Sequence, residues 1–120
     1  MQWRPVPGFE NHYSISERGD VVRVAPGPRT KPGRVLRPAV GRNGYLTTRL
    51  FVQGTGSTRL IHRLVATVFH GPPPAGKPMV RHLDGDPRNN HFSNLRWGDA
   101  VENAQDKRFH DEHGRGVTAP

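Results

Sequence analysis

The residues best suited to chemistry lie close together in the stretch from Val80 to Asn103. His82 carries an imidazole whose ordinary pKa is near neutrality, so its neutral form can take a proton from water. Asn94 and Asn103 follow it, and each asparagine side chain offers one amide oxygen and two N–H donors. These three residues can activate a nucleophile if the fold brings their side chains together.

The local sequence indicates how these side chains are positioned. Val80–Leu83 is a short strand with apolar ends, and Asp84–Pro87 is a strong turn sequence. Leu95–Trp97 supplies a second short strand, which the following glycine breaks. Asp99, followed three residues later by Glu102, predicts a helix N-cap with a capping box. We therefore predict a hairpin and a helix that folds back on it, with the last asparagine in the first helical turn.

This stretch resembles the HNH nuclease motif of phage and intron homing endonucleases, which is a ββα-metal fold. The resemblance rests on His82, Asp84–Asp86, Asn89–Asn90, Asn94–Leu95, Trp97 and Glu102–Asn103. It implies that His82 is the general base, that Asn94 orients the imidazole through its amide, and that Asn103 binds a metal. It also implies hydrolysis of phosphodiester bonds, with a divalent cation stabilising the phosphate and the leaving 3′ oxygen. Mg²⁺ or Mn²⁺ is expected, with Zn²⁺ or Ni²⁺ as further candidates in vitro.

The chain departs from the family pattern at Arg81, where the family commonly has Asp or His as a second metal ligand. An arginine cannot coordinate a cation, and its charge opposes one. Three outcomes follow. Asp84 or Asp86 replaces the missing ligand, Asn103 holds the ion with phosphate and water, or Arg81 binds the phosphate and cleavage is slow or absent. We expect activity to be retained, with Asn103 and Asp84 as ligands, because the other motif positions keep their residues.

The distribution of charge indicates a polyanionic partner. The 120-residue chain has a formal net charge of +8, and residues 21–83 contain eleven Lys or Arg and no Asp or Glu. A segment of one sign suits contact with a nucleic-acid backbone, although it can also be a solvated surface that aids solubility. We expect double-stranded DNA as the partner. The predicted contact residues are Arg23, Arg29, Lys31, Arg34, Arg37, Arg42, Arg49 and Arg81.

The whole chain predicts an α+β fold, in which a small antiparallel β meander precedes a helix and the ββα-metal motif. Residues 45–52 alternate as a strand after the Asn-Gly turn at 43–44. His62–His70 has the apolar stripe of an amphipathic helix, and we interpret His62 as a helix-start residue rather than a metal ligand.

The N-terminal sequence carries a second resemblance. Trp3, Gly8–Glu10, Tyr13–Ser16 and Gly19–Val21 are similar to the NUMOD-type module that precedes HNH domains and is associated there with DNA contact. We expect a NUMOD-like basic, β-rich region at 1–58, the nuclease region at 59–110 and a flexible tail at 111–120.

Two functions of different class remain open. The first is a metal-dependent HNH endonuclease, whose monomer would nick DNA and whose homodimer could cut both strands. The second is a non-catalytic DNA-binding module with a degenerate site; RNA binding is a weaker third choice, because the sequence has no base-stacking aromatic array. The absence of cysteine excludes a disulfide framework and Cys-ligated zinc. With no apolar run of membrane-spanning length, we expect a cytoplasmic protein encoded by a phage or mobile element in a bacterial host.

Overall fold

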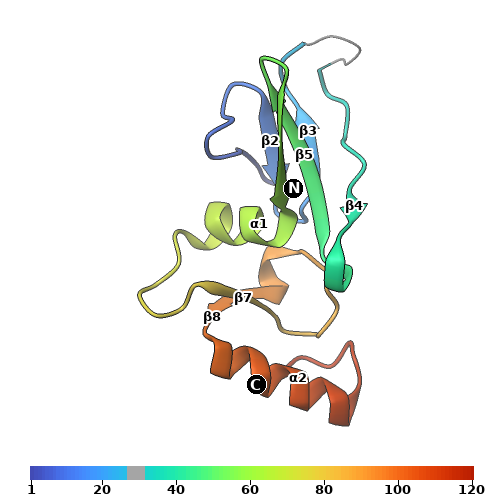
Figure 1. The fold of residues 1–120 in the computed structure, drawn as a ribbon, viewed down its shortest axis with the longest axis vertical. Coiled ribbons are helices and arrows are strands. Elements are labelled where there is room, and N and C mark those ends of the chain that lie inside the picture. The colour runs from blue at the N-terminus through green and yellow to red at the C-terminus, as the bar shows by residue number, and fades with distance from the viewer. Residues whose placement is uncertain (27–31) are drawn as a thin grey trace.

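The computed structural model describes residues 1–26 and 32–120, which form three small antiparallel sheets and two helices along one long axis (Figure 1). The extents are 48 × 28 × 27 Å. The two N-terminal sheets lie at one end, helix α1 crosses the middle, and the β7–β8 hairpin with helix α2 forms the other end. No helix in these ranges is long and apolar enough to cross a membrane.

The predicted meander is present as two three-stranded sheets. The first contains β1 (Trp3–Pro5), β2 (Tyr13–Ser16) and β3 (Val21–Arg23), and the second contains β4 (Ala39–Val40), β5 (Leu46–Val52) and β6 (Thr55–Leu60). A 3-10 turn, η1 (Arg42–Gly44), connects β4 to β5. Gln53 and Gly54 adopt positive φ angles and close the β5–β6 hairpin in two residues, so that β6 begins at Thr55. The predicted region boundary at 58/59 consequently falls inside this strand.

The hairpin and helix expected for the nuclease motif are also present. Helix α1 (Ile61–His70) ends at Gly71 and precedes β7 (Met79–His82), the 3-10 turn η2 (Phe92–Asn94), β8 (Leu95–Gly98) and α2 (Ala100–His113). The predicted capping box begins α2: Asp99 Oδ1 accepts from the Glu102 N–H at 2.8 Å, and Glu102 Oε1 accepts from the Asp99 N–H at 3.1 Å.

One hydrophobic core runs from the N-terminal sheets to the hairpin. Helix α1 joins the two ends, because its buried Ile61, Val65 and Ala66 pack in one cluster with residues of both. The buried residues of that cluster are Val6, Tyr13, Ile15, Val21, Leu50, Ile61, Val65, Ala66, Val80 and Leu95. This shared core fixes the N-terminal sheets relative to the nuclease hairpin, although the chain has few apolar residues.

The C-terminal segment 111–120, which we expected to be flexible, makes defined contacts in the structure. Helix α2 continues to His113, and the chain then turns back along the hairpin. The Gly116 N–H donates to the Asp84 carbonyl and the Ala119 N–H donates to the Leu83 carbonyl, each at 2.7 Å. Ala119 is buried. These two hydrogen bonds and the burial of Ala119 hold the tail against the end of β7.

Candidate active site

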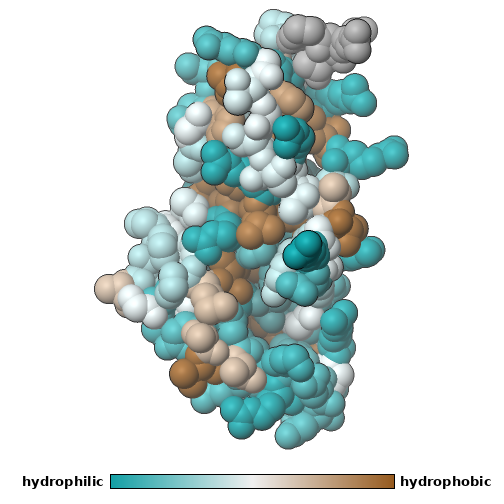
Figure 2. Space-filling view, viewed as in Figure 1, coloured by the Kyte–Doolittle hydropathy of each residue, from teal (hydrophilic) through white to brown (hydrophobic). Residues whose placement is uncertain are grey.

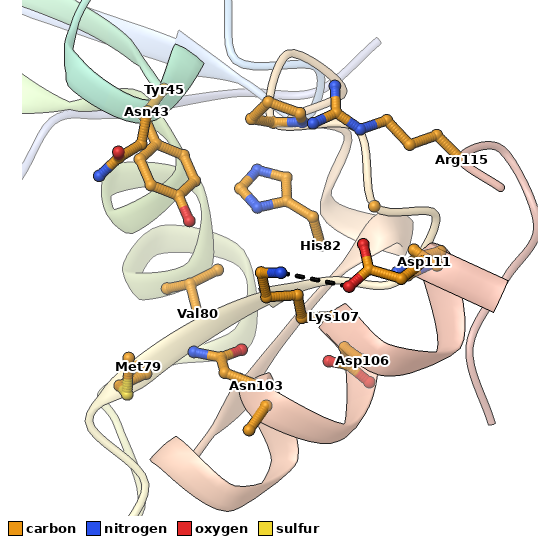
Figure 3. A pocket seen from close by; sticks show the side chains of 14 residues that line it. Asn43, Tyr45, Met79, Val80, His82, Asn103, Asp106, Lys107, Asp111 and Arg115 are labelled. Carbon is orange, nitrogen blue, oxygen red and sulfur yellow. Dashed lines mark hydrogen bonds and ion pairs between the residues drawn. The ribbon is translucent and has the colours of Figure 1, made fainter.

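A cavity of about 570 Å³ separates the face of α2 from the η1 turn and the β7 strand. Figure 3 shows His82 at its centre, with Asn43 and Tyr45 on one side and the side chains of α2 opposite. The wall includes Tyr45, His82, Asn103, Asp106, Lys107 and His110. The structure therefore brings two of the three predicted catalytic residues, His82 and Asn103, to one cavity.

The His82 imidazole is held in a defined tautomer. The side chain is buried, and its Nε2 lies 2.9 Å from Asn90 Oδ1. An amide oxygen can only accept, so Nε2 carries the proton and Nδ1 carries the lone pair. Burial lowers the pKa of His82. The Asn90 hydrogen bond and the charges of Asp84 and Asp86 raise it, but burial is the larger effect. The result is a neutral imidazole near pH 7 with Nδ1 available as a base.

The residue that holds the imidazole is Asn90, which corrects our prediction of Asn94. The Asn94 side chain instead organises the loop between β7 and β8. Its Oδ1 accepts from the Asp84 N–H at 3.0 Å, and its Nδ2 donates to Asp84 Oδ1 and to the Asn89 carbonyl, both at 2.9 Å. Two adjacent asparagines are typical of an irregular connection, so the sequence alone does not single out Asn90 as the partner of His82.

Asp84 is engaged within this loop and does not line the cavity, contrary to its predicted role as a metal ligand. Its carboxylate accepts from Asn89 Nδ2, from the Asp86 N–H and from Asn94 Nδ2, at 2.8 to 2.9 Å. Burial would raise the pKa of Asp84, but these three hydrogen bonds outweigh it and the pKa is lowered. The carboxylate therefore stabilises the loop that carries Asn90.

Arg81, predicted as a DNA contact, makes an ion pair with α2 and is not among the residues that line the cavity. Successive side chains of a strand point to opposite faces, so Arg81 is turned away from His82. Its Nε and Nη2 donate to the two carboxylate oxygens of Asp106 at 2.7 and 2.9 Å, and Glu102 lies 3.8 Å from Nη1. The bond to Asp106 raises the pKa of Arg81. The pair anchors the helix that carries Asn103 to the strand that carries His82.

Two aromatic neighbours of His82 were not expected as site residues. His62, on α1, has its ring centroid 5.2 Å from that of His82, and Tyr45 has its centroid 5.8 Å away. Both come from segments distant in sequence, so spacing within the HNH motif could not reveal them. His62 is buried and its Nδ1 has no hydrogen-bond partner among the described residues. It does not bond its neighbours as a helix-start residue would.

The burial of His62 predicts a loss of stability in acid. Burial, with the charges of His82 and Arg63, lowers the pKa of His62 from 6.5 to about 4. Below pH 6.5 the unfolded chain binds a proton that the folded chain does not, so stability falls until the pH reaches about 4. The free energy of unfolding attributable to His62 should fall by about 3 kcal/mol across this window.

Urea unfolding at a series of pH values measures this effect. The His62→Phe variant keeps a ring of similar shape and should show a flatter dependence below pH 6.5. An unchanged slope in the variant would show that His62 is not the group responsible.

Apart from Arg81, the predicted DNA contacts divide into three groups. Arg34, Arg37, Arg42 and Arg49 are exposed. Hydrophilic residues cover much of the face of the molecule seen in Figure 2. Arg23 is buried and corrects the prediction, because its Nη1 donates to the Tyr13 hydroxyl at 2.8 Å and its Nε to the Ala25 carbonyl at 2.7 Å. Arg29 and Lys31 lie outside the described residues.

A β-hairpin, a helix packed across it and a histidine on the first strand together define a ββα-type nuclease site behind an N-terminal β region. Comparison with known families agrees with this class: the NUMOD4 motif matches residues 1–51, and the HNH endonuclease family matches residues 59–105. Residues 59–105 are therefore an HNH endonuclease domain that follows a NUMOD4 motif.

The similar proteins include one phage enzyme and two viral ones. DNA endonuclease I-HmuI of Bacillus phage SP01 is 37% identical over 97 residues, covering 81% of this chain and 52% of the enzyme. Two uncharacterized HNH endonucleases of Acanthamoeba polyphaga mimivirus are 34% and 33% identical, with 86% of this chain covered in each case and 28% and 25% of the relatives. This chain thus spans about half the length of the phage relative.

A solved structure of I-HmuI, described as showing DNA binding and cleavage by this HNH homing endonuclease, matches the fold. The TM-score is 0.77 at 33% identity, over 98% of this chain and 62% of that one. The structural match spans both the N-terminal sheets and the nuclease hairpin, which confirms the predicted fold class and the family.

Proposed function

We propose that this chain is a metal-dependent DNA endonuclease in which His82 is the general base. The observation that carries the proposal is the state of the imidazole, whose Nε2 donates to Asn90 while Nδ1 keeps its lone pair beside the cavity. The chemistry named for the similar phage enzyme, DNA binding and cleavage, supports the same function here. The phage relative also supports a site of action in the cytoplasm of a bacterial host.

The protein residues account for activation of the nucleophile. A water molecule beside His82 gives a proton to Nδ1 as its oxygen forms a bond to phosphorus, and the bond from phosphorus to the 3′ oxygen breaks. The imidazolium that forms is stabilised by Asn90, because Oδ1 continues to accept from Nε2–H. The leaving 3′ oxygen takes a proton from solvent, and His82 afterwards returns its own proton to solvent. The products expected from this step are a 5′-phosphate and a 3′-hydroxyl.

The residues on the α2 side of the cavity fit a weakly held divalent cation. The Asn103 side chain lines the cavity and makes no hydrogen bond to any described residue, so its amide oxygen is available as a ligand. Asp106 lies one helical turn further on, but its carboxylate is shared with Arg81. No three His, Asp or Glu side chains of residues 1–26 and 32–120 converge as a metal cluster. A bound Mg²⁺ or Mn²⁺ would stabilise the charge on the phosphate and on the leaving 3′ oxygen.

The proposed substrate is double-stranded DNA, bound by the exposed Arg34, Arg37, Arg42 and Arg49. These side chains contact the phosphates, so the affinity should fall as the salt concentration rises. One ββα site cuts one strand, and a monomer would therefore produce nicks.

A non-catalytic DNA-binding module is the second candidate. It is favoured by the Arg81–Asp106 pair, because a positively charged guanidinium stands at the position where the family commonly has a metal-binding Asp or His. Supercoiled plasmid incubated with Mg²⁺, Mn²⁺ or EDTA separates the two functions. The endonuclease relaxes the plasmid only in the presence of metal. A protein that binds the plasmid but leaves it supercoiled under every condition is the binding module, and the proposed function would then be wrong.

The pH dependence of cleavage tests His82 as the base. Burial holds the pKa of His82 below 6.5, and His62 adds no charge because it is neutral above about pH 4. Activity requires the neutral imidazole, so kcat/KM should stay high as the pH falls to 6.5 and decline only below it. A decline of kcat/KM that begins at or above pH 6.5 would contradict a base whose pKa is lowered by burial.

A further inference from the structure

Tyr45 belongs to the N-terminal region but touches the nuclease site. It follows the η1 turn directly and lies within the span that matches the NUMOD4 motif. Its ring is stacked on the His82 imidazole, with the centroids 5.8 Å apart and the planes at 24°. In Figure 3 the Tyr45 ring approaches His82 from the side opposite α2. A residue from the DNA-binding part of the chain thus forms one wall around the catalytic histidine.

Three side chains hold the imidazole from different directions. Asn90 accepts from Nε2, Tyr45 covers one ring face, and His62 meets the ring at 64° with the centroids 5.2 Å apart. Tyr45 and His62 also contact each other, with the centroids 4.8 Å apart. The hydrogen bond alone would leave the ring free to tilt about the Nε2–Oδ1 line. The two aromatic contacts remove this freedom and leave Nδ1 as the ring nitrogen that is open to a reactant.

The backbone around Tyr45 is built to place its ring. The Gly41 N–H donates to the Tyr45 carbonyl at 2.8 Å, which closes the turn. Within it, Asn43 and Gly44 have φ angles of 63° and 79°, a left-handed conformation that both residue types tolerate. Gly44 also packs near Pro87 of the catalytic loop, because a Cβ added to Gly44 would lie 3.4 Å from the Pro87 ring. The turn is therefore docked against the loop that carries Asn90.

We propose that Tyr45 is a positioning residue for His82, through which the N-terminal DNA-binding region aligns the general base. The proposal rests on the endonuclease function stated above. The aromatic ring carries the effect, since the Tyr45 hydroxyl makes no hydrogen bond to any described residue. DNA that contacts the exposed Arg42 in the same turn would press the turn toward the site and hold the imidazole in its productive orientation.

Kinetics of three variants test this role. Tyr45→Ala removes the ring, and kcat should fall about 10- to 100-fold through loss of alignment, as small misplacements of a reacting group do. KM should stay within about twofold, because DNA contacts are unchanged. Tyr45→Phe should restore the wild-type kcat. Arg42→Ala, in the same turn, should raise KM and also lower kcat, because it removes the DNA contact that presses the turn toward His82. A Tyr45→Ala variant with normal kcat, or a Tyr45→Phe variant as slow as it, would overturn the proposal.

A readout without cleavage keeps this test separate from the proposed function. The Nε2 proton of His82, bonded to Asn90 in a buried site, should give a slowly exchanging imidazole N–H signal in NMR spectra, assigned by its absence from His82→Gln. The signal should persist in Tyr45→Phe and broaden or vanish in Tyr45→Ala, whose fold is checked by thermal unfolding. An unchanged signal in Tyr45→Ala overturns the positioning role even if the wild-type protein cleaves DNA. Loss of the signal in Tyr45→Ala supports the positioning role even if the wild-type protein does not cleave DNA.

Discussion

Replacing His82 with alanine is expected to lower the single-turnover rate of plasmid nicking by about 10²- to 10⁴-fold, the usual contribution of a general base. The imidazole Nδ1 is the proton acceptor for the attacking water, and the hydrogen bond to Asn90 gives it the correct tautomer. DNA affinity should remain close to that of the wild type, because the predicted phosphate contacts are arginines elsewhere in the chain. Quench-flow or manual time courses at saturating protein measure the rate, and a mobility shift measures the affinity.

His113→Ala is the matched control for this experiment. His113 ends α2, is exposed and does not line the cavity, so its variant should cut at the wild-type rate. His82 is buried, and the fold of its variant is therefore checked by thermal unfolding before the rates are compared. A folded His82→Ala protein that nicks as fast as His113→Ala would exclude His82 as the base.

Asp106→Ala is expected to lower the free energy of unfolding by about 3–5 kcal/mol, the cost of leaving one charge of a mostly buried pair without its partner. The Arg81 and Asp106 side chains are 14% and 12% exposed, and two hydrogen bonds join them. In the variant the guanidinium remains between β7 and α2 with Glu102 at 3.8 Å as its remaining acidic neighbour. Urea unfolding followed by circular dichroism measures the change.

Two further variants show whether burial is the cause. The Lys107–Asp111 pair lies on the same helix at 3.2 Å, but its side chains are 79% and 65% exposed. Asp111→Ala should therefore cost less than about 1 kcal/mol. The double variant Arg81→Met, Asp106→Leu removes both charges and should recover most of the stability lost in Asp106→Ala. If Asp106→Ala is no more destabilising than Asp111→Ala, the ion pair does not anchor α2.

The sequence predicts the helices and strands around the site well, because each is determined by residues a few positions apart. The capping box at Asp99 and Glu102, the alternation in residues 45–52 and the apolar stripe at 62–70 all depend on neighbours a few positions apart. His82 and Asn103 could be placed together for the same reason. A histidine at the end of one strand and an asparagine in the first turn of the following helix meet whenever the helix folds back on its hairpin.

The errors concern contacts that spacing cannot specify. Asn90 and Asn94 both lie between β7 and β8, where no strand or helix period relates their side chains, so the sequence could not show which amide meets His82. Tyr45 reaches the site from a distant segment through the shared core. Asp106 was not recognised as the partner of Arg81, since the pairing depends on how α2 is rotated against β7. The contacts of the tail with the carbonyls of Leu83 and Asp84 join segments that are distant in sequence, so local spacing could not predict them.

The most direct measurement of the proposed chemistry is the structure of the DNA ends that the protein produces. Supercoiled plasmid is nicked by the wild-type protein with Mg²⁺ or Mn²⁺, freed of protein and treated with DNA ligase, which seals only a 5′-phosphate next to a 3′-hydroxyl. We predict that ligase seals all nicks made by the wild-type protein, and that His82→Ala makes almost no nicks. Nicks that ligase cannot close, or closable nicks made equally by His82→Ala, would contradict hydrolysis by a His82-activated water with the 3′ oxygen as leaving group.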